Sequence, residues 1–287
     1  MRNGRPSDIL LGGLCALAAL TGVGALFWII ADLLQLGLPQ ISIGFLTGEV
    51  TESGRSGGIG PILVSTALIL LSALVVAVPL GVGCALWFSE MIPEENRGGQ
   101  LLTASIDLLA SVPSIVFGLF GMVFFCQVLG LGFSILSGGL TLGCMILPIM
   151  IRTTISAMRA IPCELRPAAA ALGLTQTTTL GKVLLPRAVP GILVGITIGV
   201  ARALSETAAL IFTSGYATRW PGSLSDSGRA VSVHIYDLAM NIPNGSARAS
   251  ASALVLLLLI LTINLAASFF SDRWLAKQSA SCSTLNG

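Results

Sequence analysis

The stretch PILVSTALILLSALVVAVPLGVGCALWFS, residues 61–89, decides what kind of molecule this sequence makes. It contains no charged residue, and a helix of this length can cross the ~30 Å hydrocarbon core of a bilayer. Over the whole chain of 287 residues, 54% are hydrophobic and 10% are charged, which leaves too few polar side chains to cover a water-soluble globule. We therefore expect an all-α membrane protein.

Outside this stretch, further segments are long and apolar enough to span a membrane, so that about six transmembrane helices are expected. With the first stretch included, the predicted spans are 9–36, 61–89, 101–130, 134–157, 187–213 and 250–270. Pro79, Pro113 and Pro148 fall within the second, third and fourth spans. Each proline removes a backbone hydrogen-bond donor and is expected to bend its helix.

The lysines and arginines are distributed unevenly between the two sides that these spans define. If the N-terminus is cytoplasmic, that side carries ten of them and the other side four, while Arg202 lies within a span. Because cytoplasmic loops of membrane proteins are enriched in positive charge, we expect both termini to be cytoplasmic. The net charge of +2, without a long run of like charge, argues against nucleic acid as a partner.

Two segments are expected on the outer side, 37–60 and 214–249. The second contains enough polar and aromatic residues to form a small ordered cap, and it is either a plain surface loop or a docking surface. His234 lies in this segment without an evident partner for metal binding or catalysis, and we assign it no role.

The longest cytoplasmic segment, 152–186, contains most of RPAAAALGLTQTTTLGKVLLPRAVPGI, which begins at Arg166. Pro167 suits the first position of a helix, where its missing N–H would be unpaired anyway. The alanines that follow are strong helix formers with little bulk, and Gly173 offers a stop. We expect a short helix with a small-residue face at the membrane surface, against which another protein can pack; an ordinary amphipathic interfacial helix is the alternative.

The same segment resembles the signature loop of ABC-importer permeases, which reads Glu-Ala-Ala, three residues, Gly, nine residues, then Ile-x-Leu-Pro. Ala168, Ala169 and Gly173 match the first part, and Val183–Pro186 closes the pattern with Val in place of Ile. The chain departs from the family at Pro167, where the usual residue is Glu. Glu164, one turn earlier, is a candidate substitute for that acid.

The resemblance implies an ABC type I importer permease-like bundle, with an N-terminal helix and outer loop at 1–60 and a permease core at 61–287. In this family the loop is a coupling helix that seats in a cleft of a separate ATPase, so ATP and Mg would be bound by that partner. No Gly-x-x-x-x-Gly-Lys-Ser/Thr phosphate loop occurs in this chain, which is therefore expected not to be an enzyme by itself. The expected coupling residues are Glu164, Arg166, Pro167, Ala168, Ala169, Ala170, Gly173, Leu185 and Pro186.

Two charged residues stand near the middle of the fifth predicted span, in the stretch GILVGITIGVARALSETAALIFTSG, residues 191–215, which covers most of that span. An unpaired ion in the bilayer costs at least ~2.5 kcal/mol on insertion scales, so Arg202 and Glu206 must be compensated. Their spacing of four predicts that they share one helix face, close enough for an ion pair or a polar pathway. A guanidinium suits phosphate or another oxyanion, and we assign both residues to the substrate path, with a purely structural pair as the alternative.

Several stretches narrow the resemblance to the phosphate-specific permeases. They are SGGIGPILVSTALI (56–69), LLASVPSIVFGLFG (108–121) and ARALSETAALIFTSG (201–215). The stretch 231–265 is more similar to the PstA-type subunit than to its partner PstC. The resemblance implies a bacterial inner-membrane location, phosphate as substrate, and four kinds of partner: a PstC-like second permease, a PstB-like ATP-binding dimer, a periplasmic PstS-like phosphate-binding protein and membrane lipids.

Two other hypotheses remain open. The same machine could carry sulfate, molybdate or tungstate, because one arginine does not distinguish tetrahedral oxyanions. A self-sufficient secondary transporter is the second, but it would need coupling-ion acids at the membrane midplane and an inverted repeat, and neither is evident.

Overall fold

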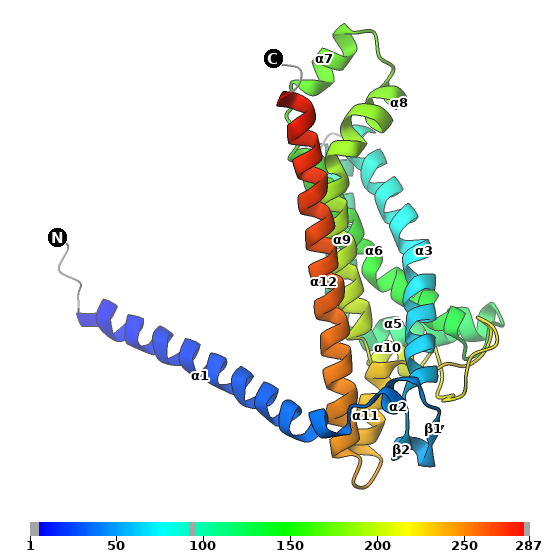
Figure 1. Ribbon diagram of the computed structural model, residues 1–287. Coiled ribbons are helices and arrows are strands. Elements are labelled where there is room, and N and C mark those ends of the chain that lie inside the picture. Colours follow the sequence, from blue (N-terminus) through cyan, green and yellow to red (C-terminus); the bar gives the residue numbers. More distant parts are fainter. Residues whose placement is uncertain (1–5, 92–95, 284–287) are drawn as a thin grey trace.

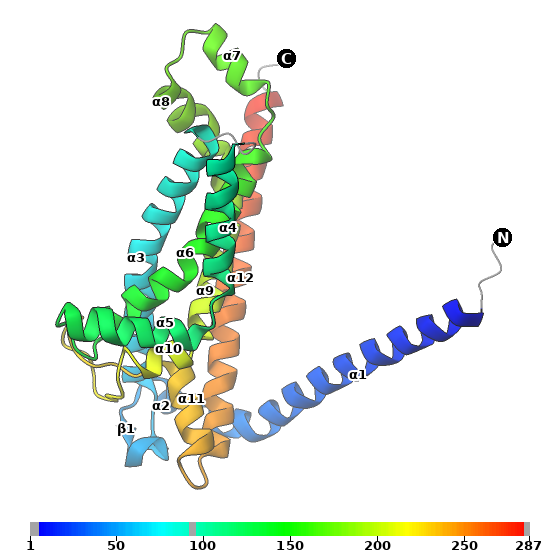
Figure 2. The ribbon, with the colours of Figure 1, turned by 180° about the vertical axis from the view of Figure 1, so that it is seen from behind.

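The computed structural model describes residues 6–91 and 96–283, and long apolar helices dominate it (Figures 1 and 2). A small hairpin and helix α11 lie at one end of the bundle, called here the α11 end, and helices α7 and α8 lie at the other, the α7 end. The helices are α1 (Pro6–Gly37), α2 (Ile43–Thr47), α3 (Gly60–Met91), α4 (Arg97–Ser111), α5 (Ser114–Gly121), α6 (Ile135–Arg159), α7 (Leu165–Ala171), α8 (Gln176–Thr178), α9 (Leu185–Leu204), α10 (Ala208–Ile211), α11 (Val231–Met240) and α12 (Ser246–Ser283). The short elements are the 3₁₀ turns η1 (Leu38–Gln40) and η2 (Glu52–Gly54), the π-helical turns η3 (Met122–Val128) and η4 (Thr179–Leu184), and the strands β1 (Val50–Thr51) and β2 (Ser56–Gly57).

Five of the described helical segments are long and apolar enough to cross a membrane, and a bent pair of helices adds a sixth candidate. The five are Leu10–Gln40, Gly60–Glu90, Ile135–Arg159, Gln176–Leu204 and Ser246–Ser271. The prediction of an all-helical membrane protein with about six spans is therefore confirmed.

The third predicted span, 101–130, is not one straight helix. It consists of α4 and α5 with η3, and the two halves meet at an angle of 91°. Val112 and Pro113 take extended backbone conformations at the bend, because the proline ring disfavours a helical residue before it and supplies no N–H. Helices α3 and α6, by contrast, continue through Pro79 and Pro148.

The fifth predicted span, 187–213, is also corrected by the structure. Helix α9 ends at Leu204, nine residues before the predicted end, and α10 begins only at Ala208. At this end of α9, the hydroxyl of Ser205 donates to the carbonyl oxygens of Ala201 and Arg202, at 3.0 and 3.1 Å. At its other end, the helical path extends back through η4 and α8 to Gln176, so the span begins earlier than predicted.

Helix α6 is the central helix, and small residues let its neighbours approach it closely. It packs against α3, α4, α5 and α9. A Cβ atom added to Gly139 of α6 would collide with the Ser72 hydroxyl of α3 and lie 3.0 Å from the carbonyl oxygen of Ile69. Close contact of this kind is the main source of attraction between helices in lipid, where apolar burial gives no further gain.

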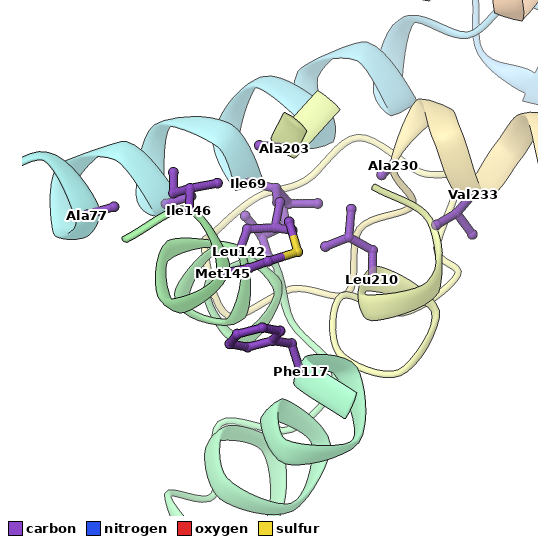
Figure 3. Packing of buried hydrophobic residues seen from close by; sticks show 12 residues of the cluster. Ile69, Ala77, Phe117, Leu142, Met145, Ile146, Ala203, Leu210, Ala230 and Val233 are labelled. Carbon is purple, nitrogen blue, oxygen red and sulfur yellow. The ribbon is translucent and has the colours of Figure 1, made fainter. Parts of the chain in front are cut away.

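The largest buried cluster lies where α3, α5, α6, α10 and α11 meet (Figure 3). Leu142 of α6 is 1% exposed, with Phe117 of α5 and Leu210 of α10 near it, and Val233 of α11 lies beyond Leu210 in the same cluster. This packing holds α10 and α11 against the bundle, although they lie beyond the break that ends α9.

At the α11 end, β1 and β2 pair antiparallel, with Val50 opposite Gly57. Beside them, Phe45 of α2 packs against Ile59, just before α3, and Ala251 of α12. Arg248 of α12 donates a hydrogen bond of 2.7 Å to the Gly57 carbonyl oxygen and lies over the Phe45 ring. Helix α1 leaves the bundle at this end and projects away from it (Figures 1 and 2). Its apolar span is 0% buried within the chain, so lipid or another protein must cover it.

The α3–α6 contact predicts that Gly139→Ala destabilises the protein, because the new methyl group would lie 2.8 Å from the Ser72 Cβ atom. Overpacking of this kind costs ~1–3 kcal/mol. Gly83→Ala in α3 is the matched control, since nothing lies within 4 Å of a Cβ there. Thermal unfolding in detergent should show a lower Tm for Gly139→Ala only. Equal Tm values for both variants would contradict close packing between α3 and α6 at Gly139.

Candidate functional site

The short helix predicted in segment 152–186 exists as α7, at the end of the bundle farthest from the hairpin (Figure 1). The segment around it is shorter than expected, because α6 continues to Arg159. Pro167 is the third residue of α7 rather than the first, which is still a position whose N–H has no partner within the helix. Glu164 precedes the helix, is exposed, and makes no capping hydrogen bond with its side chain.

Gly173 ends this helix as the sequence predicted. Its φ of +73° is a left-handed conformation that glycine adopts without steric cost. The N–H groups of Gly173 and Leu174 donate to the carbonyl oxygens of Ala170 and Ala169, at 2.9 and 3.1 Å, so the last turn of α7 is closed.

The outer face of α7 is small and unobstructed. Pro167, Ala168 and Ala170 are exposed, whereas Ala169 points inward and is 4% exposed. Leu172, just beyond the helix, is 79% exposed. This face can receive a partner without any side chain having to move.

Arg166 holds α7 against the bundle. Its Nη2 atom lies 2.8 Å from Oε1 of Glu90, at the end of α3. A cavity of about 300 Å³ lies beside this ion pair, between α3, α7 and η4, and Ala170 and Leu184 line it. Sequence reasoning placed Arg166 on the coupling surface but did not identify Glu90, because the two residues are 76 positions apart.

The remaining predicted coupling residues lie on a different element. Leu185 and Pro186 are the first residues of α9, partly buried, and do not belong to the exposed face of α7. They sit within the helical path Gln176–Leu204, which leads from the α7 end of the bundle to Arg202.

The structure does not bring Arg202 and Glu206 together as predicted. Arg202 is exposed near the end of α9, whereas Glu206 follows that helix and is 7% exposed. In the part of the chain that the structure describes, the two form no ion pair. The spacing of four predicted a shared helix face, but the end of α9 at Leu204 separates the residues.

Glu206 instead organises the junction between α9, α10 and α11. Its Oε1 atom accepts a hydrogen bond of 3.3 Å from the N–H of Ala209, at the start of α10. Its backbone oxygen accepts a hydrogen bond of 2.5 Å from the hydroxyl of Ser232 in α11. The Arg202 side chain is therefore exposed, whereas the Glu206 side chain is buried at this junction.

A buried polar cluster at the α11 end was missed by the sequence analysis. Arg229 is 8% exposed, and its Nη1 atom lies 3.0 Å from Oδ2 of Asp237 and 3.5 Å from Nδ1 of His234. His234 lies on α11, not in a loop, and it has partners. Burial, and secondarily the charge of Arg229, lowers the pKa of His234 to about 4. The spacing of His234 and Asp237 on one helix turn was the available signal.

Among residues 6–91 and 96–283, no group of three or more His, Cys, Asp or Glu side chains is arranged to hold a metal ion. The candidate features described so far are the exposed face of α7, the exposed Arg202 and the buried cluster around Arg229.

Comparisons with known proteins agree with this geometry. Residues 77–277 match the family model described as binding-protein-dependent transport system inner membrane component. The probable ABC transporter permease protein YqgI of Bacillus subtilis is 32% identical over 95% of this chain and 96% of its own length. The phosphate transport system permease protein PstA of Xylella fastidiosa is 33% identical over 72% of each chain. Among solved structures, a bacterial ABC transporter involved in the import of the acidic polysaccharide alginate has a TM-score of 0.66 at 19% identity, covering 93% of this chain and 96% of its own.

The Arg166–Glu90 contact predicts that Arg166→Gln loosens α7. A partly exposed ion pair contributes ~0.2–1 kcal/mol, so hydrogen exchange of the α7 amides should accelerate by up to about fivefold. The reversed pair Glu90→Arg with Arg166→Glu should restore protection, and Arg187→Gln, an exposed charge at the start of α9, should leave exchange unchanged. Exchange unaffected by Arg166→Gln would show that packing alone holds α7.

The burial of His234 predicts that the folded state loses stability as the pH falls from 6.5 toward 4. In that range the unfolded chain binds a proton at His234 and the folded chain does not, because the folded pKa is lowered to about 4. The free energy of unfolding falls by at most ~1.4 kcal/mol for each pH unit in this range. Tm measured across this range should fall less steeply for His234→Gln than for the unmodified protein; parallel curves would contradict a buried neutral histidine.

Proposed function

The chain belongs to the family of binding-protein-dependent transport system inner membrane components, and from this we propose that it is the PstA-type permease subunit of an ATP-driven phosphate importer. The observation that carries the proposal is the helical path from the exposed α7 region to Arg202, in a chain whose PstA relatives are aligned over 72% of its length. This path connects the proposed docking surface for the ATPase, at α7, with the proposed oxyanion-binding residue, Arg202.

The subunit is a multi-pass membrane permease, and the ATPase of such importers is a separate chain. We therefore assign ATP and Mg to that partner. The α7 end is assigned to the cytoplasm together with both termini, in keeping with the excess of positive charge on that side. The α11 end, with its ordered hairpin and buried polar cluster, would face the periplasm.

In this proposal α7 seats in the ATP-binding subunit. The exposed small side chains of Pro167, Ala168 and Ala170 allow close approach, and Leu172 supplies apolar contact area at the edge. Arg166 is already engaged with Glu90, so its role is to position α7 rather than to bind the partner. Pro167 cannot supply the charge that the usual Glu would, and exposed Glu164 is the acid nearest to it along the chain.

Arg202 is assigned to the substrate path. A guanidinium stays protonated at physiological pH and presents forked donors that match a tetrahedral oxyanion. Because Glu206 caps α10 instead of pairing with Arg202, the guanidinium is available to an incoming anion. Path residues must bind weakly enough to release their cargo, and an exposed single arginine meets that requirement.

The complete importer then requires a PstC-like second permease, a PstB-like ATP-binding dimer and a PstS-like phosphate-binding protein on the periplasmic side. The second permease would complete the path, because Arg202 is exposed in the isolated chain and cannot face lipid without cost.

We expect Arg202→Ala to abolish phosphate uptake by the reconstituted complex, while the variant still copurifies with the ATPase. Arg202→Lys keeps the charge but not the forked donors and should retain only part of the rate. Uptake of radiolabelled phosphate, with sulfate and molybdate as competitors, tests both the role and the cargo. Uptake by Arg202→Ala at the normal rate would rule out a role of Arg202 in the substrate path. Stronger inhibition by sulfate or molybdate than by unlabelled phosphate would show that the transported substrate is that anion and not phosphate.

A further inference from the structure

A cavity of about 480 Å³ lies between α4, α6 and α9, on the side of the bundle toward α7. Figure 2 shows α4 alongside α6 in this region. The volume falls in the range of about 300–1,000 Å³ that is typical of ligand pockets. The cavity is lined by Arg152, Ser156 and Arg159 of α6, Thr103 of α4, and Gly191 and Val194 of α9, among others.

The lining of this cavity is positively charged. Arg152, Ser156 and Arg159 follow one another at helical spacing on an exposed face of α6, and no acid belongs to the lining. The nearby carboxylate of Asp107, on α4, forms an ion pair with Nη2 of Arg152. A guanidinium carries five N–H donors, so one carboxylate does not exhaust those of Arg152.

The hydroxyl groups around the cavity divide into two kinds. Thr103 and Thr153 donate to carbonyl oxygens of their own helices, at 3.0 and 2.9 Å, and are committed there. The Ser156 hydroxyl makes no hydrogen bond with any other residue that the structure describes and can donate to a ligand. The Arg152 guanidinium and the Ser156 hydroxyl together form a donor set that suits an oxyanion.

The cavity lies on the same face of α9 as Arg202. Gly191, Val194, Ile198 and Arg202 recur at intervals of three and four residues, which places them along one side of the helix. The residues between 191 and 202 correspond to about 16 Å of helix, so the cavity lies about that far from Arg202 toward the α7 end. Val194 and Ile198, which connect the two, are 51% and 47% exposed.

We propose that this cavity binds a phosphate group through Arg152 and Ser156, as a second anion site between Arg202 and the α7 end of the subunit. The proposal rests on the phosphate-importer function proposed above. Asp107 competes with the anion for Arg152 and so keeps binding weak enough for release. The phosphate group can belong to inorganic phosphate in transit or to the headgroup of an anionic lipid, because both present the same oxygens to the same donors.

The test uses the whole importer complex in nanodiscs, without its binding protein and carrying Arg202→Ala to remove that site. Equilibrium dialysis with radiolabelled inorganic phosphate is carried out in zwitterionic lipid, and retained phosphatidylglycerol is counted by native mass spectrometry in discs that contain it. Arg152→Gln should weaken binding about tenfold, the loss of one charge-assisted contact. Asp107→Asn should strengthen it about fivefold, since a competing exposed charge is removed. Arg97→Gln, an exposed charge at the start of α4, is the matched control and should change nothing.

If Arg152→Gln and Asp107→Asn change the binding of inorganic phosphate in opposite directions, the ligand of the site is inorganic phosphate in transit. Opposite effects only on retained phosphatidylglycerol identify the lipid headgroup. Either result supports the site. The proposal is overturned if both variants bind like the control. It is also overturned if both change binding in the same direction, which is the result expected when the Arg152–Asp107 ion pair is only structural. Uptake by the complex without substitutions is measured in parallel: a complex that imports no phosphate refutes the proposed function, whereas normal uptake with unresponsive variants refutes only this site.

Discussion

Close packing of small residues along α6 is the constraint on which the rest of the structure depends. Lipid offers no hydrophobic gain for bringing two helices together, so the helices must attract each other through direct contact. Gly139 of α6 accommodates Ser72 of α3 on one side. Farther along, Gly195 of α9 accommodates Thr153 on the other. These contacts fix α3 and α9 relative to α6, and α9 carries Arg202. Helix α7 is tied to the end of α3 through the Arg166–Glu90 ion pair.

The features that follow from local physics could be predicted from the sequence. Apolar length identified the spans, the proline at 113 identified a bend, and Gly173 identified the end of α7. The size of the bend could not be predicted, because a proline removes one hydrogen bond but the neighbouring helices decide the angle. The end of α9 was missed for a related reason: residues 205–213 are apolar enough to continue a helix, but Ser205 and Glu206 use their side chains to cap backbone groups there.

Charge partners were the least predictable part of the site. Arg202 and Glu206 are four residues apart and unpaired, whereas Arg166 pairs with Glu90 across 76 positions. Asp107 of α4 pairs with Arg152 on a different helix, α6. Sequence spacing describes neighbours along one helix, but in a bundle the surrounding helices supply most of the possible partners. The sequence could therefore show which charges need compensation but not which residues provide it.

The uninterrupted helical path from Gln176 to Leu204 has a mechanical consequence. Its twenty-nine residues correspond to about 43 Å of helix. A tilt of about 10° around its middle would displace each tip by almost 4 Å, in opposite directions. Under the proposed function, a displacement of the end beside α8 would therefore move the Arg202 guanidinium sideways in the opposite direction.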